Sequence, residues 1–138
     1  MSSEHILLVE DDAVVIHALE LQLRNAGYKV VAAGNAAEAI RATVTQQPDL
    51  MILDLTLIDG IAVNGLRDGL SMLQWLHRTL PEANFPVIVH TADTSESVDE
   101  RAQSYGVAGV FRKGEGDAKD LLKAVRKALD QRKPREAA

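Results

Sequence analysis

The chain has 138 residues, of which 46% are hydrophobic and 25% charged, and its formal net charge is −5 at pH 7. This length and composition suit one globular domain, and the negative charge argues against nucleic acid or an anionic membrane as a partner. The absence of cysteine excludes disulfides and thiolate metal sites. No signal peptide or membrane span is recognisable, so we expect a cytoplasmic protein.

The first part of the chain alternates short apolar runs with segments of helical periodicity. A continuous apolar run at 6–9 predicts a buried strand, and it stops at the acidic triplet 10–12. A helical stripe follows over 13–26, where an aspartate of the triplet can cap the first turn and Gly27 can end the last. For Asp12 we favour this capping role over a part in any functional site.

The middle of the chain repeats this alternation. A second strand is predicted at 30–33, and Asn35 opens a helix whose buried stripe extends to Val44. The third apolar run, 50–53, ends at Asp54, just as the first run ends at an acidic residue. A strand followed at once by an acid therefore occurs twice.

The second half of the chain continues the pattern. The predicted elements are a helix at 69–80, a strand at 87–89, a helix at 95–105, a strand at 109–111 and a helix at 118–129. Strands that alternate with helices indicate βαβ units, a parallel sheet and helices on both of its faces. The sequence therefore predicts an α/β, doubly wound fold with a five-stranded parallel sheet and five helices.

Two further groups of polar residues suggest structural roles only. Basic residues gather near the carboxyl end, namely Arg126, Lys127, Arg132, Lys133 and Arg135. We interpret them as complementing the dipole of the last helix. The four histidines share no metal-ligand spacing, and we expect His90 to pack at a strand end and Trp75 to belong to the core.

Ligands bind doubly wound sheets beyond the carboxyl ends of the strands, so the residues directly after the strands are the candidates for a site. These are Glu10, Asp11, Asp54, Thr91 and Lys113. Crowded carboxylates repel one another, and a hard divalent cation such as Mg²⁺ relieves this repulsion by taking oxygen ligands. With one carboxylate as nucleophile, the metal and Lys113 can neutralise a phosphoryl group while Thr91 donates a hydrogen bond. The pattern favours phosphoryl transfer to Asp54.

The motifs at these strand ends resemble those of the receiver domains of two-component response regulators, the CheY-like family. The matching segments are Ile6-Leu7-Leu8-Val9-Glu10-Asp11-Asp12, Leu50-Met51-Ile52-Leu53-Asp54, Val87-Ile88-Val89-His90-Thr91-Ala92 and Lys113. The resemblance spans nearly the whole chain and implies a flavodoxin-like sheet with strand order 2-1-3-4-5. It also implies a single receiver domain over residues 1–138, with its core at about 5–131 and a flexible tail at 132–138.

The resemblance gives several of these residues a role. It implies that Asp54 is the phosphoacceptor and that Glu10 and Asp11 form the acidic pair of the family. Asp11 would bind Mg²⁺ directly, and the backbone carbonyl of Thr56 would be another ligand.

Thr91 and Lys113 would be the switch hydroxyl and the characteristic lysine of the family. Such a protein is not a conventional enzyme, since it catalyses its own phosphorylation from a phosphohistidine donor and its own dephosphorylation. Its implied partners are a histidine kinase or a histidine phosphotransfer protein, together with a downstream protein. We expect no attached output domain, so signalling would proceed by partner binding or through a phosphorelay.

The chain departs from the family pattern in three places. The loop 56–67 lacks the usual proline and is longer than usual, and it can form a small hairpin or pack its own apolar residues. Gly114 follows the lysine where the family has proline. Val110 stands where many receivers have an aromatic that swings on phosphorylation, and Phe111 points to the opposite face. We therefore expect readout through the loop.

Other functions compete with this one. A pseudo-receiver that acts as a constitutive interaction module is the alternative, although the intact site residues argue against it. A haloacid-dehalogenase-type phosphohydrolase needs a second acid two residues after its aspartate, where this chain has Thr56. A dinucleotide-binding or P-loop enzyme needs a glycine-rich turn after the first strand, and none is present.

Overall fold

The computed structural model of the chain describes residues 3–55, 69–80, 83–92, 96–113 and 118–132. Its strands are β1 (His5–Val9), β2 (Lys29–Ala33), β3 (Leu50–Leu53), β4 (Val87–Thr91) and β5 (Gly109–Arg112). Its helices are α1 (Ala13–Asn25), α2 (Ala36–Gln46), α3 (Gly69–Thr79), α4 (Glu96–Ser104) and α5 (Ala118–Gln131). Every predicted strand and helix is present, with small differences at the ends.

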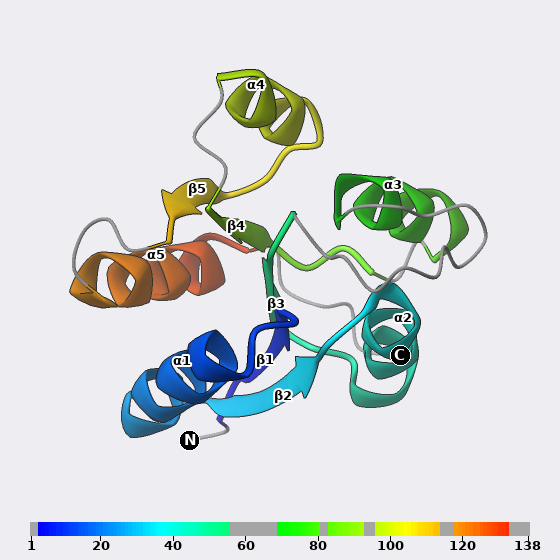
Figure 1. Cartoon of the computed structure of the whole chain (residues 1–138). Helices are drawn as coiled ribbons and strands as arrows, with labels where there is room; N and C mark the ends of the chain where they lie inside the picture. The colour runs from blue at the N-terminus through cyan, green and yellow to red at the C-terminus, as the bar shows by residue number, and fades with distance from the viewer. Residues whose placement is uncertain (1–2, 56–68, 81–82, 93–95, 114–117, 133–138) are drawn as a thin grey trace.

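The strands form one parallel sheet in the order β2-β1-β3-β4-β5, as the resemblance implied (Figure 1). Strand β1 pairs with β2 on one side and β3 on the other, so that Ile6 lies opposite both Val30 and Leu50. The chain moves outward from β1 to β2 and then returns to β3, which reverses the strand order. The carboxyl ends of β1 and β3 therefore meet where ligands bind in this kind of fold.

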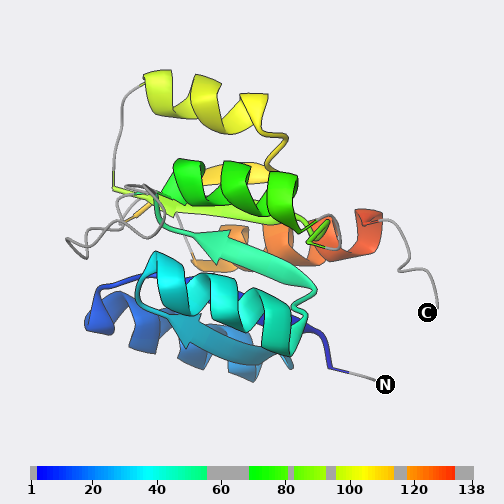
Figure 2. The same cartoon turned by 90° about the vertical axis from the view of Figure 1, so that its right-hand side faces the viewer.

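Two apolar layers cover the faces of the sheet (Figures 1 and 2). In one layer α2, α3 and α4 pack on the sheet, and Ala39, Leu73 and Ala102 are almost completely buried there. In the other layer α1 and α5 pack on the opposite face through Leu23 and Val125. Strands covered on both faces need apolar residues at every position, which explains the continuous apolar runs. No helix in the described ranges is long and apolar enough to cross a membrane.

Helix α1 begins and ends as its sequence predicts. The carboxylate of Asp12 accepts hydrogen bonds from the backbone N–H groups of Val14 at 2.9 Å and Val15 at 3.4 Å. Gly27 follows the helix with a φ of +100°, a conformation that residues with a side chain rarely adopt. The capping role predicted for Asp12 is confirmed.

Helix α2 corrects one prediction about its buried face. Asn35 caps the helix, since its Oδ1 accepts a hydrogen bond from the backbone N–H of Glu38 at 2.8 Å. Val44, expected on the buried stripe, is 55% exposed, and Thr43 is buried instead. Thr43 lies one turn after Ala39 and donates its hydroxyl hydrogen bond to the carbonyl of that residue at 2.8 Å. This internal bond satisfies the hydroxyl, so a polar residue occupies the inner face.

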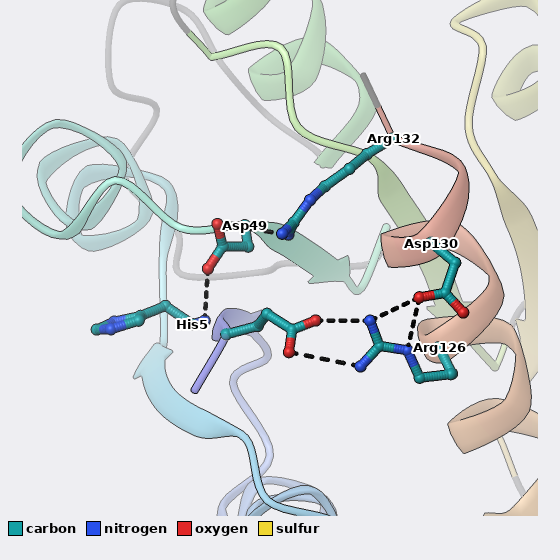
Figure 3. Close-up of polar contacts among 6 residues, drawn as sticks. His5, Asp49, Arg126, Asp130 and Arg132 are labelled. Atoms are coloured by element: carbon teal, nitrogen blue, oxygen red, sulfur yellow. Dashed lines mark hydrogen bonds and ion pairs between the residues drawn. The ribbon is translucent and has the colours of Figure 1, made fainter. Parts of the chain in front are cut away.

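Ion pairs bind the end of α5 to the amino-terminal edge of the sheet (Figure 3). Arg126 donates hydrogen bonds at 2.8 Å to Glu4, just before β1, and to Asp130 on the next turn. Arg132 Nη1 lies 3.4 Å from Asp49, an ion pair without hydrogen-bond geometry. Asp49 also accepts the first N–H of β1 at 2.7 Å. The last turn of α5 contains no basic residue, so the dipole interpretation does not account for Arg126, whose guanidinium pairs with carboxylates. For the basic residues after the helix it stays a prediction.

Candidate functional site

The hydrogen-bond ladders of the sheet continue one step past the strands and place the site residues. The backbone N–H of Glu10 donates to the last carbonyl of β2 at 2.9 Å, and that of Asp54 donates to the last carbonyl of β1 at 2.9 Å. The N–H of Lys113 donates to the carbonyl of Thr91, the last residue of β4, at 2.8 Å. The parallel sheet thus positions residues from distant parts of the sequence along one edge.

Three carboxylates lie together at this edge. One oxygen from each of Glu10, Asp11 and Asp54 lies within 4.8 Å of the others. Glu10 and Asp54 are each 1% exposed, whereas Asp11 is exposed. The cluster therefore consists of two buried acids and a third acid that is exposed to solvent.

Lys113 connects the two buried acids. Its Nζ donates hydrogen bonds to Glu10 Oε1 at 2.7 Å and to Asp54 Oδ2 at 2.8 Å. Burial opposes the charge on the Lys113 ammonium, but its bonds to Asp54 and Glu10, together with their negative charges, outweigh burial and raise its pKa above the ordinary value. Lys113 is therefore a permanent cation at neutral pH.

Glu10 has a strongly perturbed pKa. Burial raises the pKa of Glu10 from its ordinary value of 4.5 to about 7. The bond from Lys113 lowers it, while the negative charge of Asp54 raises it again. A single ammonium therefore does not fully compensate the negative charge of the two buried carboxylates.

The donor set of the cluster fits a hard divalent cation. In the parts of the chain that the structure describes, this is the one group of acids, histidines or cysteines close enough to hold a metal ion. All of its donors are carboxylate oxygens, which Mg²⁺ prefers to nitrogen or sulfur. A cation here would also relieve the repulsion that raises the Glu10 pKa.

Comparison with known proteins decides the family to which the chain belongs. The family model for the response regulator receiver domain matches residues 6–126. The chain belongs to the response regulator receiver domain family. This receiver domain is similar to the transcriptional regulatory protein GlrR of Escherichia coli (strain K12), to which it is 32% identical over 130 residues. The match covers 94% of the receiver domain and 27% of GlrR, so the chain spans only part of that relative's length.

Solved receiver domains share its architecture. The CheY-like receiver domain protein of Methanospirillum hungatei JF-1 superposes with a TM-score of 0.81 at 24% identity, covering 94% of this chain and 96% of that one. The non-phosphorylated HemR receiver domain of Leptospira biflexa also gives a TM-score of 0.81, at 25% identity, covering 96% and 99%. The predicted doubly wound fold is confirmed.

Thr91 and its neighbours form the β4 side of the candidate site. Thr91 is completely buried at the strand end, and the small residue Ala92 after it is exposed. His90 is half-buried, and its buried Nδ1 has no hydrogen-bond partner within the described ranges. Burial and the positive charge of Lys113 lower the pKa of His90, so it is a neutral packing residue at neutral pH.

Side chains of β5 alternate between the two faces of the receiver domain as predicted. Val110 packs in the layer of α2, α3 and α4, and Phe111 packs in the layer of α1 and α5. Our sequence reasoning missed Arg112, whose Nη2 donates a hydrogen bond to Asp99 Oδ1 on α4 at 2.6 Å. Because side chains alternate along a strand, Arg112 lies on the same face as Val110, and this alternation could have predicted its position facing the layer that contains α4.

Several predicted features lie outside the described residues. They are the long loop 56–67, the Thr56 carbonyl, the peptide between Lys113 and Gly114, and the tail beyond residue 132. The expectations for them remain predictions.

Proposed function

We propose that this receiver domain is a phosphoryl-accepting switch with Asp54 as the phosphoacceptor. The observation that carries the proposal is the contact of Lys113 with both Asp54 and Glu10, next to the exposed Asp11. Crowding acids into one buried place is unfavourable for the fold by itself. A site that binds a cation and a phosphoryl group recovers this free energy, and perturbed groups of this kind are typical of functional sites.

The reaction needs a donor and the Asp54 carboxylate. An oxygen of Asp54 bonds to the phosphorus of a phosphohistidine as the N–P bond breaks, and the electron pair returns to the imidazole nitrogen, which then takes a proton. The Lys113 ammonium, already at this carboxylate, would balance charge on the phosphoryl oxygens, and the Thr91 hydroxyl would donate a hydrogen bond to one of them. Water would later hydrolyse the phosphoaspartate, so the protein would not act as a conventional enzyme.

Glu10, Asp11, Asp54 and the backbone carbonyl of Thr56 are the groups that we assign to Mg²⁺. When bound, the ion would neutralise negative charge on the phosphoryl oxygens. The contribution of the chain is to hold three carboxylates within 4.8 Å of one another, with the exposed Asp11 accessible from solvent.

The partners follow from the chemistry of the donor. We assign a histidine kinase or a histidine phosphotransfer protein as the donor, and a downstream protein that reads the switch by binding or through a phosphorelay. The similarity to GlrR, a transcriptional regulatory protein, supports a place in signalling. We take residues 1–138 as one cytoplasmic receiver domain, and its net charge of −5 gives no reason to add nucleic acid or membrane as direct partners.

Incubation with acetyl phosphate and Mg²⁺, followed by intact mass spectrometry, tests the proposal. We expect one phosphoryl group on the wild type, none on Asp54→Asn, and none on the wild type in EDTA. The matched control is Asp120→Asn, an exposed acid in the first turn of α5, which should be labelled like the wild type.

Two results would count against the proposal. Labelling that persists in Asp54→Asn would place the acceptor elsewhere. A wild type that takes no phosphoryl group and binds no beryllofluoride would instead be a constitutive interaction module with a receiver fold.

A further inference from the structure

The carboxyl end of β5 carries two adjacent cations with different partners. Lys113 reaches the buried acids Asp54 and Glu10, whereas Arg112 reaches α4. Arg112 Nη2 lies 2.6 Å from Oδ1 of Asp99. The carboxyl end of β5 therefore connects the acidic cluster to α4.

Arg112 is the more buried partner of this ion pair. Its side chain is 16% exposed, against 48% for Asp99. Its other terminal nitrogen, Nη1, is buried and has no hydrogen-bond partner among the residues that the structure describes. A largely buried guanidinium with an unsatisfied nitrogen is unfavourable unless a carboxylate compensates its charge. The position of Arg112 therefore depends on Asp99.

Residues near Asp99 show how the described part of α4 contacts the sheet. Within 99–104, where the side chains of this helix are described, Ala102 is the buried one. The exposed side chains of that range are Glu100, Arg101, Gln103 and Ser104. In Figure 2, α4 lies at the end of the row formed by α2, α3 and α4. Besides the packing of Ala102, the ion pair thus attaches the described part of α4 to β5.

Arg112 is also connected to the groups that would respond at the site. It is the register partner of Thr91 in the sheet, and the N–H of the next residue, Lys113, donates to the Thr91 carbonyl at 2.8 Å. A phosphoryl group on Asp54 would engage the Thr91 hydroxyl and change the contacts that Lys113 already makes with Asp54, so both neighbours of Arg112 would respond. At the β5 position where many receivers have an aromatic residue, this chain has Val110, which packs on the same face of the sheet as α4.

We infer that the Arg112–Asp99 ion pair is the link through which the phosphorylation state of Asp54 sets the position of α4. The inference rests on the proposed function, since it specifies how that site is read. In the unphosphorylated protein the pair holds α4 on the sheet. Phosphorylation draws Thr91 toward the new group and changes the contacts of Lys113, which displaces Arg112 and repositions α4. Arg112 and Asp99 are positioning residues, because neither touches the reacting atoms.

A pair of spin labels can measure this movement, because the chain has no native cysteine. Gln74→Cys on α3 and Gln103→Cys on α4 are both exposed attachment points. Pulsed electron paramagnetic resonance gives the distance between them with and without beryllofluoride and Mg²⁺. Fluorescence of Trp75 reports binding of this phosphoryl mimic separately. We expect the distance distribution of the labelled parent to shift when the mimic binds.

Three substitutions test the link in this labelled parent. In Arg112→Met and in Asp99→Asn we expect an altered distribution before the mimic is added and no further shift afterwards. By linkage, these variants should bind the mimic at least as tightly as the parent, because α4 is already released. Arg112→Lys keeps a cation and should retain part of the shift. The control Arg126→Met breaks ion pairs at the opposite edge of the sheet and should respond like the parent.

The possible results distinguish failure of the proposed function from failure of the Arg112–Asp99 link. A parent that does not bind the mimic overturns the proposed function and the link together. A parent that binds it without a shift in distance overturns the link alone, and so does an equal shift in the parent, Arg112→Met and Asp99→Asn. Thermal melting checks that each variant is folded. If Arg112→Met does not fold, Asp99→Asn and Arg112→Lys decide.

Discussion

Glu10, Asp11 and Asp12 are consecutive in the chain, yet their surroundings differ completely. Glu10 is buried and bonded to Lys113, Asp11 is exposed at the mouth of the acidic cluster, and Asp12 caps α1. The difference arises because the chain passes from a buried strand to a surface helix over these residues. A substitution at each of them should therefore have its own signature.

At Glu10 that signature is a dependence of stability on pH in the absence of divalent ions. The folded-state pKa of about 7 lies above the ordinary value of 4.5, so between these values the folded protein keeps a proton that the unfolded chain releases. The free energy of unfolding therefore falls as pH rises through this range, and the loss is complete above the folded-state pKa. Glu10→Gln cannot ionise and should be more stable than the wild type in mild alkali, by on the order of 1–3 kcal/mol.

Urea unfolding in EDTA at about pH 5 and about pH 8 measures this effect. The matched control is Glu100→Gln, an exposed acid on α4, which should keep the pH dependence of the wild type. If Glu10→Gln and the wild type lost stability equally between the two pH values, Glu10 would have to ionise as an ordinary exposed acid.

At the scale of the element, helix α1 begins directly after the acidic residues Glu10, Asp11 and Asp12. The Asp12 carboxylate satisfies backbone N–H groups of the first turn, and the Asp12 N–H itself donates to Glu10 Oε1 at 3.2 Å. The backbone of Asp12 therefore holds the first turn of α1 beside the acidic cluster. The Asp12 carboxylate bonds to the helix terminus and is not one of the three carboxylates of the cluster.

Removing the cap should weaken the helix and leave the chemistry intact. We expect Asp12→Ala to lower the free energy of unfolding by about 1 kcal/mol, because the N–H groups of Val14 and Val15 lose their acceptor. Asp12→Asn keeps an acceptor and should retain most of the stability. Chemical denaturation measures both, and phosphorylation by acetyl phosphate should be unchanged. Loss of labelling in a folded Asp12→Ala protein would give Asp12 a direct part in the site.

At the scale of the whole molecule, the arrangement of strands and helices was predictable because each element follows its own periodicity. Buried strands are continuous apolar runs, helices show stripes, and the turn residues Asp12 and Gly27 separate them. The candidate site was predictable for a related reason. In a parallel sheet, the residue after each strand lies at one edge, so Glu10 and Asp54 could be brought together without knowledge of packing.

The features that the sequence did not predict depend on contacts between separate elements. Arg126 pairs with Glu4 from the other end of the chain, and Arg112 pairs with an acid on α4. Charge alone cannot select such partners, because exposed opposite charges are numerous and each pair contributes little. The buried residue of α2 at position 43 was missed because its hydroxyl bonds within its own helix, which hydrophobic patterning does not register.

The same separation of residues along the chain predicts that Mg²⁺ stabilises the folded molecule. Asp54 is distant in sequence from Glu10 and Asp11, so the unfolded chain does not hold the three carboxylates together. An ion that binds the folded state alone should raise the free energy of unfolding by about 2.7 kcal/mol at a free concentration of about 100 times its dissociation constant. Asp11→Asn should lose most of this increment.

Protons compete with the ion for these carboxylates, so the increment should be larger at pH values above the Glu10 pKa of about 7 than below it. Chemical denaturation with and without Mg²⁺ at both pH values measures the increment. Glu4→Gln, at the opposite edge of the sheet, is the matched control and should respond to Mg²⁺ like the wild type. An increment that is the same in Asp11→Asn and the wild type would place the ion away from this cluster, because a site without its exposed carboxylate cannot bind the ion equally well.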